Sequence, residues 1–135
     1  MKDALLARVD ADRAMLVDFL QRFVRCETPT PPGDTLAAAR FVEEALGSRG
    51  IRFDKIAPKA DRPNYIASFD TGRPGPHLVL NGHIDVFPVE TTVGWTRDPW
   101  GGELVEGKVY GRGACDMKCG TTASIFTYLY LHEIG

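Results

Sequence analysis

The chain has no hydrophobic run long enough to cross a bilayer and no apolar core of the kind found in a signal peptide. Near the N-terminus, charged side chains such as Lys2, Arg8 and Asp12 repeatedly interrupt the apolar residues. Cysteine is scarce as well. The three cysteines are an odd number without a disulfide framework, which favours free thiols in a reducing compartment. Together these features predict a cytoplasmic protein without a membrane partner.

An excess of charge of either sign is also lacking. The 16 basic and 18 acidic residues leave a formal net charge of −2, so there is no electrostatic basis for binding nucleic acid or an anionic membrane surface. The chain contains no Gly-x-Ser-x-Gly sequence, which argues against the serine hydrolases that use this turn. Its 44% hydrophobic and 25% charged residues are typical of an ordinary globular protein.

Hydrophobic periodicity predicts helices at both ends of the chain. In the first segment, apolar side chains recur at helical spacing with charges on the opposite face, and a run of prolines at residues 28–33 ends it. A second helix begins near Asp34 or Thr35, since either side chain is able to cap it. The expected helices are residues 5–26, residues 34 to 47 or 50, and residues 121–132.

Short segments between these helices are predicted to be β-strands. Residues 77–80 are mostly apolar, which is typical of a strand covered on both faces. The final helix is itself apolar and needs further strands to cover it, so we expect the natural polypeptide to continue beyond residue 135. The predicted fold class is α/β, a mixed β-sheet sandwiched by helices. The expected strands are residues 51–56, 64–69, 77–80, 103–105 and 108–110, with an irregular stretch at residues 81–102 and a hairpin turn at residues 106–107.

The first chemical feature is His83, which follows the expected strand at residues 77–80. Ligand sites in open α/β sheets lie at the carboxyl ends of strands, so His83 is placed at a suitable edge. A neutral imidazole binds zinc well when an acceptor holds its second nitrogen, and Asp85 is able to supply that acceptor. On its own, a His-x-Asp pair is also typical of an ordinary hydrogen bond in a loop.

The second feature is Asp116, in a glycine-rich loop that leads into the final helix. Glycines around an acidic residue allow a tight backbone turn that aims a single carboxylate. A carboxylate has two oxygens and is therefore able to bridge two divalent cations. Taken alone, Asp116 is equally well explained as the N-cap of the helix that follows.

Together the two features resemble the two signature segments of a zinc metallopeptidase family. The segments read HLVLNGHIDVFP (residues 77–88) and GWTRDPWGGELVEGKVYGRGACDMKCG (residues 94–120). That family includes acetylornithine deacetylase, succinyl-diaminopimelate desuccinylase, aminoacylase and the glutamate carboxypeptidases. The resemblance is close over residues 77–132, whereas the N-terminal helices and first strands agree in layout only.

The resemblance implies a role for each of three residues at a centre of two Zn²⁺ ions, with Co²⁺ or Mn²⁺ as alternatives. His83 matches the histidine that ligates one zinc, and Asp116 matches the aspartate that bridges both. Asp85 matches the catalytic aspartate that orients the histidine. Other matched residues belong to the scaffold of the second signature (Arg112, Gly113, Lys118) and to a loop that lines the entrance to the site (Trp95, Asp98, Pro99, Trp100). Cys119 departs from the family pattern, which commonly has glycine there.

The resemblance also implies what the chain lacks. Such enzymes carry a Glu-Glu pair, a later acidic ligand, a histidine ligand near the C-terminus and an inserted lid domain that forms a homodimer. We therefore interpret residues 1–135 as the N-terminal part of a phosphorylase/hydrolase-like zinc peptidase catalytic domain, without the lid domain and the second half. The implied activity is hydrolysis of the amide bond of N-acyl amino acids or short peptides, and we expect the isolated chain to be inactive.

Two other functions compete with that interpretation. One is a metal-binding remnant of such an enzyme without catalysis, because the general base and several ligands are missing. The other is a small redox or structural zinc module that uses Cys115 and Cys119 with His83 and His132. The spacing Cys-x-x-x-Cys argues against it, since zinc and redox pairs usually have two intervening residues.

Overall fold

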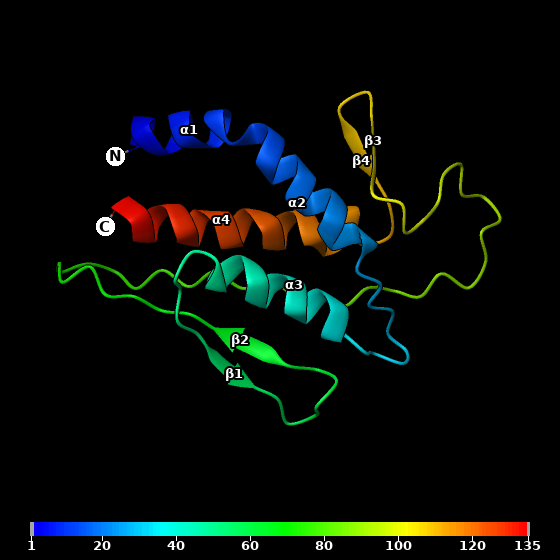
Figure 1. Ribbon diagram of the computed structural model, residues 1–135, viewed down its shortest axis with the longest axis horizontal. Coiled ribbons are helices and arrows are strands. Elements are labelled where there is room, and N and C mark those ends of the chain that lie inside the picture. The colour runs from blue at the N-terminus through cyan, green and yellow to red at the C-terminus, as the bar shows by residue number, and fades with distance from the viewer. Residues whose placement is uncertain (1, 135) are drawn as a thin grey trace.

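The computed structural model describes residues 2–134 as helices with two short hairpins, joined by long irregular segments (Figure 1). In Figure 1 the start of α1 and the end of α4 lie at the same end of the molecule. An ion pair between Arg8 and Glu133, with 3.7 Å between Nη2 and Oε2, joins these two ends. The elements are α1 (Lys2–Ala11), α2 (Arg13–Arg25), α3 (Leu36–Gly47), β1 (Asp54–Ile56), β2 (Asn64–Ile66), β3 (Glu103–Val105), β4 (Lys108–Tyr110), the π-helical turn η1 (Ala114–Lys118) and α4 (Cys119–Ile134).

The hydrophobic core lies where α2, α3 and α4 meet. The ring of Phe19 on α2 lies 4.6 Å from that of Phe41 on α3 and 5.0 Å from that of Phe126 on α4, measured between centroids. Aromatic pairs at such distances contribute beyond the area they bury. Phe23, also on α2, is fully buried (0% exposed). The amphipathic pattern therefore correctly predicted which face of α2 packs inward.

The helix predicted over residues 5–26 is two helices, interrupted at Asp12. The Asp12 carboxylate accepts hydrogen bonds from Tyr130 Oη (2.8 Å) and from Arg8 Nε (2.6 Å). Asp12 thereby attaches the junction of α1 and α2 to α4, and the chain bends there in Figure 1. Of these two helices, α2 contains buried residues and α1 contains none, so α2 is the one that contributes fully buried side chains to the core.

The two hairpins are antiparallel and separate from each other. In the first, β1 pairs with β2, and Lys55 lies opposite Tyr65. In the second, β3 pairs with β4 in the register that places Leu104 opposite Val109. This second hairpin turns at Glu106 and Gly107, which both have positive φ, and it confirms the hairpin predicted from the sequence.

The predicted strand at residues 77–80 is wrong for this structure. These residues are not in a strand, and Leu78, Val79 and Leu80 are 64%, 74% and 41% exposed. A strand needs partners for its main-chain groups, and within residues 2–134 none pairs with this segment. The α/β composition is confirmed, but the mixed sheet expected between helix layers is replaced here by two two-stranded antiparallel sheets.

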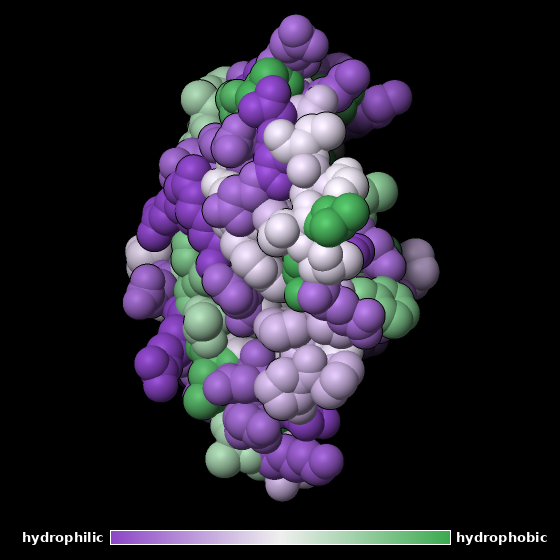
Figure 2. All heavy atoms as spheres, turned by 90° about the vertical axis from the view of Figure 1, so that its right-hand side faces the viewer, coloured by the Kyte–Doolittle hydropathy of each residue, from purple (hydrophilic) through white to green (hydrophobic). Residues whose placement is uncertain are grey.

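The outer surface mixes polar and apolar residues. Figure 2 shows the right-hand side of Figure 1, where hydrophobic residues are separated by hydrophilic and neutral ones. None of the helices within residues 2–134 has the length and apolar content needed to cross a membrane.

Candidate metal centre

The structure places His83 and Asp116 side by side, although 33 residues separate them along the chain. His83 Nε2 lies 3.2 Å from Asp116 Oδ1, with the ring nitrogen facing the carboxylate. The His83 side chain is 48% exposed and that of Asp116 is 79% exposed. Both donor groups therefore point at one small volume that is open to solvent.

Asp85 lies on the other side of the His83 ring. His83 Nδ1 is 3.0 Å from the main-chain oxygen of Asp85 and 3.2 Å from its Oδ1. A neutral imidazole carries one hydrogen, and with that hydrogen on Nδ1 the ring donates to Asp85 and keeps the lone pair of Nε2 free. This arrangement is the one that an imidazole ligand requires.

The loop that carries His83 is held from two directions. Val86 forms a parallel bridge with Pro29, and Thr28 Oγ1 donates to the Ile84 oxygen at 2.6 Å. From α4, Thr121 Oγ1 donates to the His83 oxygen at 2.9 Å. Thr28 and Thr121 are buried, so these bonds fix the backbone on both sides of the histidine.

The turn that carries Asp116 is packed closely against the same loop. Gly113 has a φ of +77°, and a Cβ atom at this position would collide with Val86 Cγ1. Asp116 has φ −114° and ψ 102°, which are not helical values, and its peptide bond to Met117 is cis. Among the hydrogen bonds of the described residues, the Asp116 carboxylate contacts His83 and accepts none from a main-chain amide, so the structure does not support the alternative interpretation of Asp116 as an N-cap.

Lys118 joins this turn to the end of α2. Its side chain is fully buried (0% exposed), and Nζ donates to the main-chain oxygens of Phe23 (3.0 Å) and Cys26 (2.6 Å). Burial lowers the pKa of Lys118 to about 8, and the nearby Cys26 and Glu27 partly oppose this decrease. The sequence singled out Lys118 only as a scaffold residue.

The loop matched to the site entrance lies against the glycine-rich turn. The guanidinium carbon of Arg112 is 5.3 Å from the centre of the Trp95 ring, and the Arg112 amide donates to the Pro99 oxygen at 2.6 Å. Within the loop, the Trp100 amide donates to Asp98 Oδ1 at 2.9 Å. Asp98 therefore shapes the loop and is not aimed at His83.

The donor atoms suit zinc in kind, because zinc takes imidazole nitrogen and carboxylate oxygen. In the described part of the chain, however, no three His, Cys, Asp or Glu side chains are close enough to hold a metal ion together. As ligands, His83 and Asp116 would be two of the roughly three or four protein groups that zinc sites use. All three cysteines are free thiols, and Cys119 Sγ donates to the Cys115 oxygen, so the structure does not support the zinc module based on cysteines.

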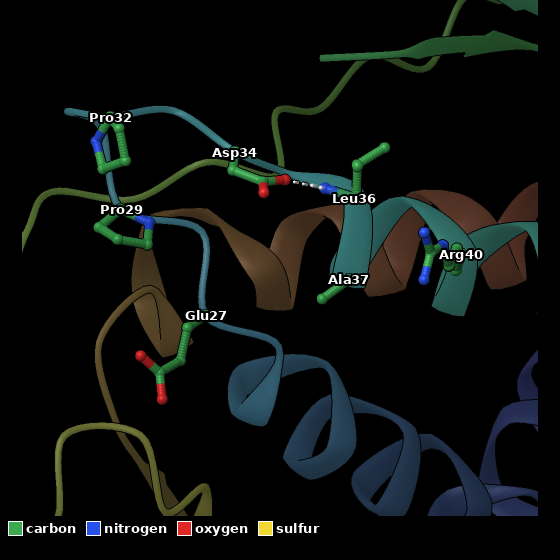
Figure 3. Close-up of a pocket in the computed structure, with 7 residues that line it drawn as sticks. All are labelled: Glu27, Pro29, Pro32, Asp34, Leu36, Ala37 and Arg40. Carbon is green, nitrogen blue, oxygen red and sulfur yellow. Dashed lines mark hydrogen bonds between the residues drawn. The ribbon is translucent and has the colours of Figure 1, made fainter. Parts of the chain in front are cut away.

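A separate cavity lies at the connection between α2 and α3 (Figure 3). In this view Asp34 Oδ1 accepts a hydrogen bond from the Leu36 amide at the start of α3 (2.9 Å), whereas the N-cap of α3 is Thr35, which makes no side-chain cap bond. The lining contains none of the three predicted site residues. It consists of Glu27, Pro29, Pro32, Asp34, Leu36, Ala37 and Arg40.

Sequence reasoning missed the residues that support the site. Thr28 and Thr121 reach the loop of His83 across 56 and 38 residues, and no local pattern marks such distant contacts. The tie between Lys118 and α2 spans more than 90 residues and is equally hidden. The sole signal was the match of Lys118 to the family scaffold.

Comparison with known proteins identifies relatives of this chain by sequence. Succinyl-diaminopimelate desuccinylase of Rhodospirillum centenum is 38% identical over 103 residues, which are 76% of this chain and 26% of that protein. The enzyme of the same name from Cereibacter sphaeroides is 41% identical over 104 residues, again 76% of this chain and 26% of the relative.

A relative with another name aligns over almost the whole chain. N-formyl-4-amino-5-aminomethyl-2-methylpyrimidine deformylase of Halalkalibacterium halodurans is 32% identical over 136 aligned positions, or 98% of this chain and 32% of the relative. The chain thus spans about a quarter to a third of the length of these curated relatives. Residues 79–135, which include His83 and Asp116, match the profile of peptidase family M20/M25/M40, and the chain belongs to this family.

Proposed function

We propose that this chain provides part of the metal centre of a hydrolase that cleaves the amide bond of N-acyl amino acids or short peptides. In this proposal His83 ligates one zinc, Asp116 bridges two zincs, and Asp85 is the catalytic aspartate that orients His83. The observation that supports it most directly is the convergence of the three side chains, with His83 Nε2 3.2 Å from Asp116 Oδ1. The names desuccinylase and deformylase, which both denote removal of an acyl group, support the reaction type.

Of the residues present, His83 and Asp116 would bind the metal ions, and Asp85 would orient the His83 ring. A bound zinc pair would supply Lewis-acid chemistry, because it polarises the scissile carbonyl and acidifies the attacking water; Co²⁺ or Mn²⁺ would serve similarly. Asp85, 3.0 Å and 3.2 Å from His83 Nδ1 through its main-chain oxygen and Oδ1, would hold the imidazole hydrogen on Nδ1 and leave Nε2 to the metal. Asp116 presents a carboxylate whose one direct partner among the described side chains is the same imidazole.

The proposal assigns the chain to the N-terminal part of a catalytic domain with a mixed sheet. In this proposal the general base, the remaining ligands, the lid domain and the homodimer contact lie outside residues 1–135, which align with about a quarter of the relative's length. We therefore propose that the isolated chain does not turn over substrate. The partner is a small N-acyl amino acid or peptide, with no nucleic acid and no membrane, in the cytoplasm.

A second candidate is a non-catalytic metal-binding remnant. The incomplete donor set within residues 2–134 favours it. The genomic sequence downstream of codon 135 separates the two: a reading frame that continues to a Glu-Glu pair supports the hydrolase, and a stop codon there supports the remnant.

Zinc binding tests the assignment of the ligands. We expect the chain to bind Zn²⁺ weakly in competition with a chromogenic chelator. His83→Ala and Asp116→Asn should each weaken binding by at least about tenfold, since removal of even a group that supports a ligand has an effect of this size. His77→Ala is the matched control, because His77 is an exposed histidine outside the site. Unchanged affinity in both site variants would exclude these residues as ligands.

Activity tests the second part of the proposal. We expect no zinc-dependent release of free amine when the purified chain is incubated with N-succinyl and N-acetyl amino acids. Release that depends on both Zn²⁺ and Asp85 would show that the chain alone contains a complete site.

A further inference from the structure

Lys118 is the charged side chain that the described structure buries completely. It has no carboxylate partner within hydrogen-bond distance among residues 2–134, and its Nζ donates to the oxygens of Phe23 and Cys26. These carbonyls belong to the last turn and the C-cap of α2; the Phe23 oxygen also accepts the Cys26 amide, and the ammonium adds a second donor at this end of the helix. The negative end of the α2 dipole lies at the same place and favours a cation there.

The same residue closes the turn around Asp116. The Lys118 amide donates to the Gly113 oxygen at 2.9 Å, so the backbone from Gly113 to Lys118 is a short closed segment. On one side this segment packs against Val86 through Gly113. On the other side it is attached to α2. Among the described residues, the hydrogen bonds that make this attachment are those of the buried ammonium group.

The Asp116 side chain has little support of its own. It is 79% exposed, and the one side-chain contact of its carboxylate in the described structure is with His83, where Oδ1 lies 3.2 Å from Nε2. An exposed carboxylate with one partner takes its direction from the backbone that carries it. The direction of this carboxylate therefore depends on how firmly the turn is attached.

We propose that Lys118 is a positioning residue that fixes the Gly113–Lys118 turn to the end of α2, so that the Asp116 carboxylate faces His83 Nε2. The effect of Lys118 on metal binding rests on the proposed function. The positioning role itself concerns the contact between the two side chains, and the test below measures that contact in the chain without added metal.

The test compares Lys118→Met, which has a similar length without charge or donors, with Val42→Ala in α3. Val42 is buried at 6% exposure in the core and is a control for general loss of stability. The readout is the set of His83 ring signals in the NMR spectrum of the metal-free chain, assigned by substituting each histidine in turn. The spectrum of Asp116→Asn shows where the His83 signals lie when the contact between the two side chains is lost.

We expect Lys118→Met to move the His83 signals to the positions seen in Asp116→Asn, while Val42→Ala leaves them unchanged. In a parallel titration, Lys118→Met should weaken Zn²⁺ binding by about tenfold, the effect typical of groups that support a ligand. His83 signals at wild-type positions in folded Lys118→Met would overturn the proposal.

Folding is controlled separately. The spectra are recorded with trimethylamine N-oxide, which favours the folded state. A Lys118→Met chain that stays unfolded there would assign the lysine to folding alone and would also overturn the proposal. If the wild-type chain binds no zinc, the proposed function fails, and the NMR comparison still decides the role of Lys118.

Discussion

Gly113 has a backbone and a packing environment that exclude a side chain. Its φ is +77°, a region where an L-residue costs roughly 1–2 kcal/mol, and a Cβ atom would also collide with the buried Val86. Gly107 in the hairpin turn has nearly the same φ, +76°, with open space around it. An alanine at either position has the cost of backbone strain, but only at Gly113 is the cost of steric overlap added, so comparing the two substitutions isolates the overlap.

We expect Gly113→Ala to lower the free energy of unfolding by roughly 1–3 kcal/mol more than Gly107→Ala, which is the usual cost of overpacking. Urea denaturation of the two variants measures this difference. Equal losses would mean that Val86 moves away at no cost and that the turn is not tightly packed on the loop of His83.

At this scale the sequence predicted which side chains meet, but not the residues that hold them in place. His83, Asp85 and Asp116 were expected to meet because their two segments together resemble the signatures of one family, whereas each local pattern alone fitted an ordinary loop hydrogen bond or a helix cap equally well. Thr28 was not expected, because a threonine after a helix carries no sign that its hydroxyl will bond to Ile84, 56 residues away. Long-range contacts of single polar groups are decided by packing that local sequence does not encode.

Tyr130 on α4 secures the junction of α1 and α2 through Asp12. Burial raises the pKa of Tyr130 from its ordinary value near 10 to about 12, and the hydrogen bond to Asp12 and its charge add to the effect. The folded chain thus holds this proton more tightly than the unfolded chain does. The resulting stabilisation is complete below about pH 10 and is lost as the pH rises through about 12.

We expect Tyr130→Phe to lack this part of the pH dependence. The difference in free energy of unfolding between wild type and variant should shrink between about pH 10 and about pH 12, measured by urea denaturation. Groups that titrate in both proteins cancel in the difference. A constant difference over this range would show that the tyrosine proton does not contribute to the junction.

Elements were predictable where their hydrogen bonds are local. The hairpin of β3 and β4 and the helices α2, α3 and α4 satisfy their main-chain groups within a few residues, so periodicity and turn residues were enough. The interruption at Asp12 was missed, because it depends on Tyr130, 118 residues away. The strand at residues 77–80 was overpredicted, since an apolar run has strand character only when other segments pair with it.

On the scale of the whole molecule, the exposed apolar segment at residues 77–80 distinguishes this structure from the one the sequence suggested. A strand covered on both faces would bury Val79, whereas the structure leaves it 74% exposed. Val42, at 6% exposure in α3, is a buried valine for comparison. The same substitution at the two positions therefore reports how each is packed.

In this chain we expect Val79→Lys to change the free energy of unfolding by less than about 0.5 kcal/mol, as for most surface substitutions. Val42→Lys should cost at least about 2 kcal/mol, because it places a charge in the core without a partner. Urea denaturation of both variants provides the comparison. If Val79→Lys were as costly as Val42→Lys, residues 77–80 would be a buried strand. The loop that carries His83 would then begin at the edge of a paired sheet instead of after an exposed segment.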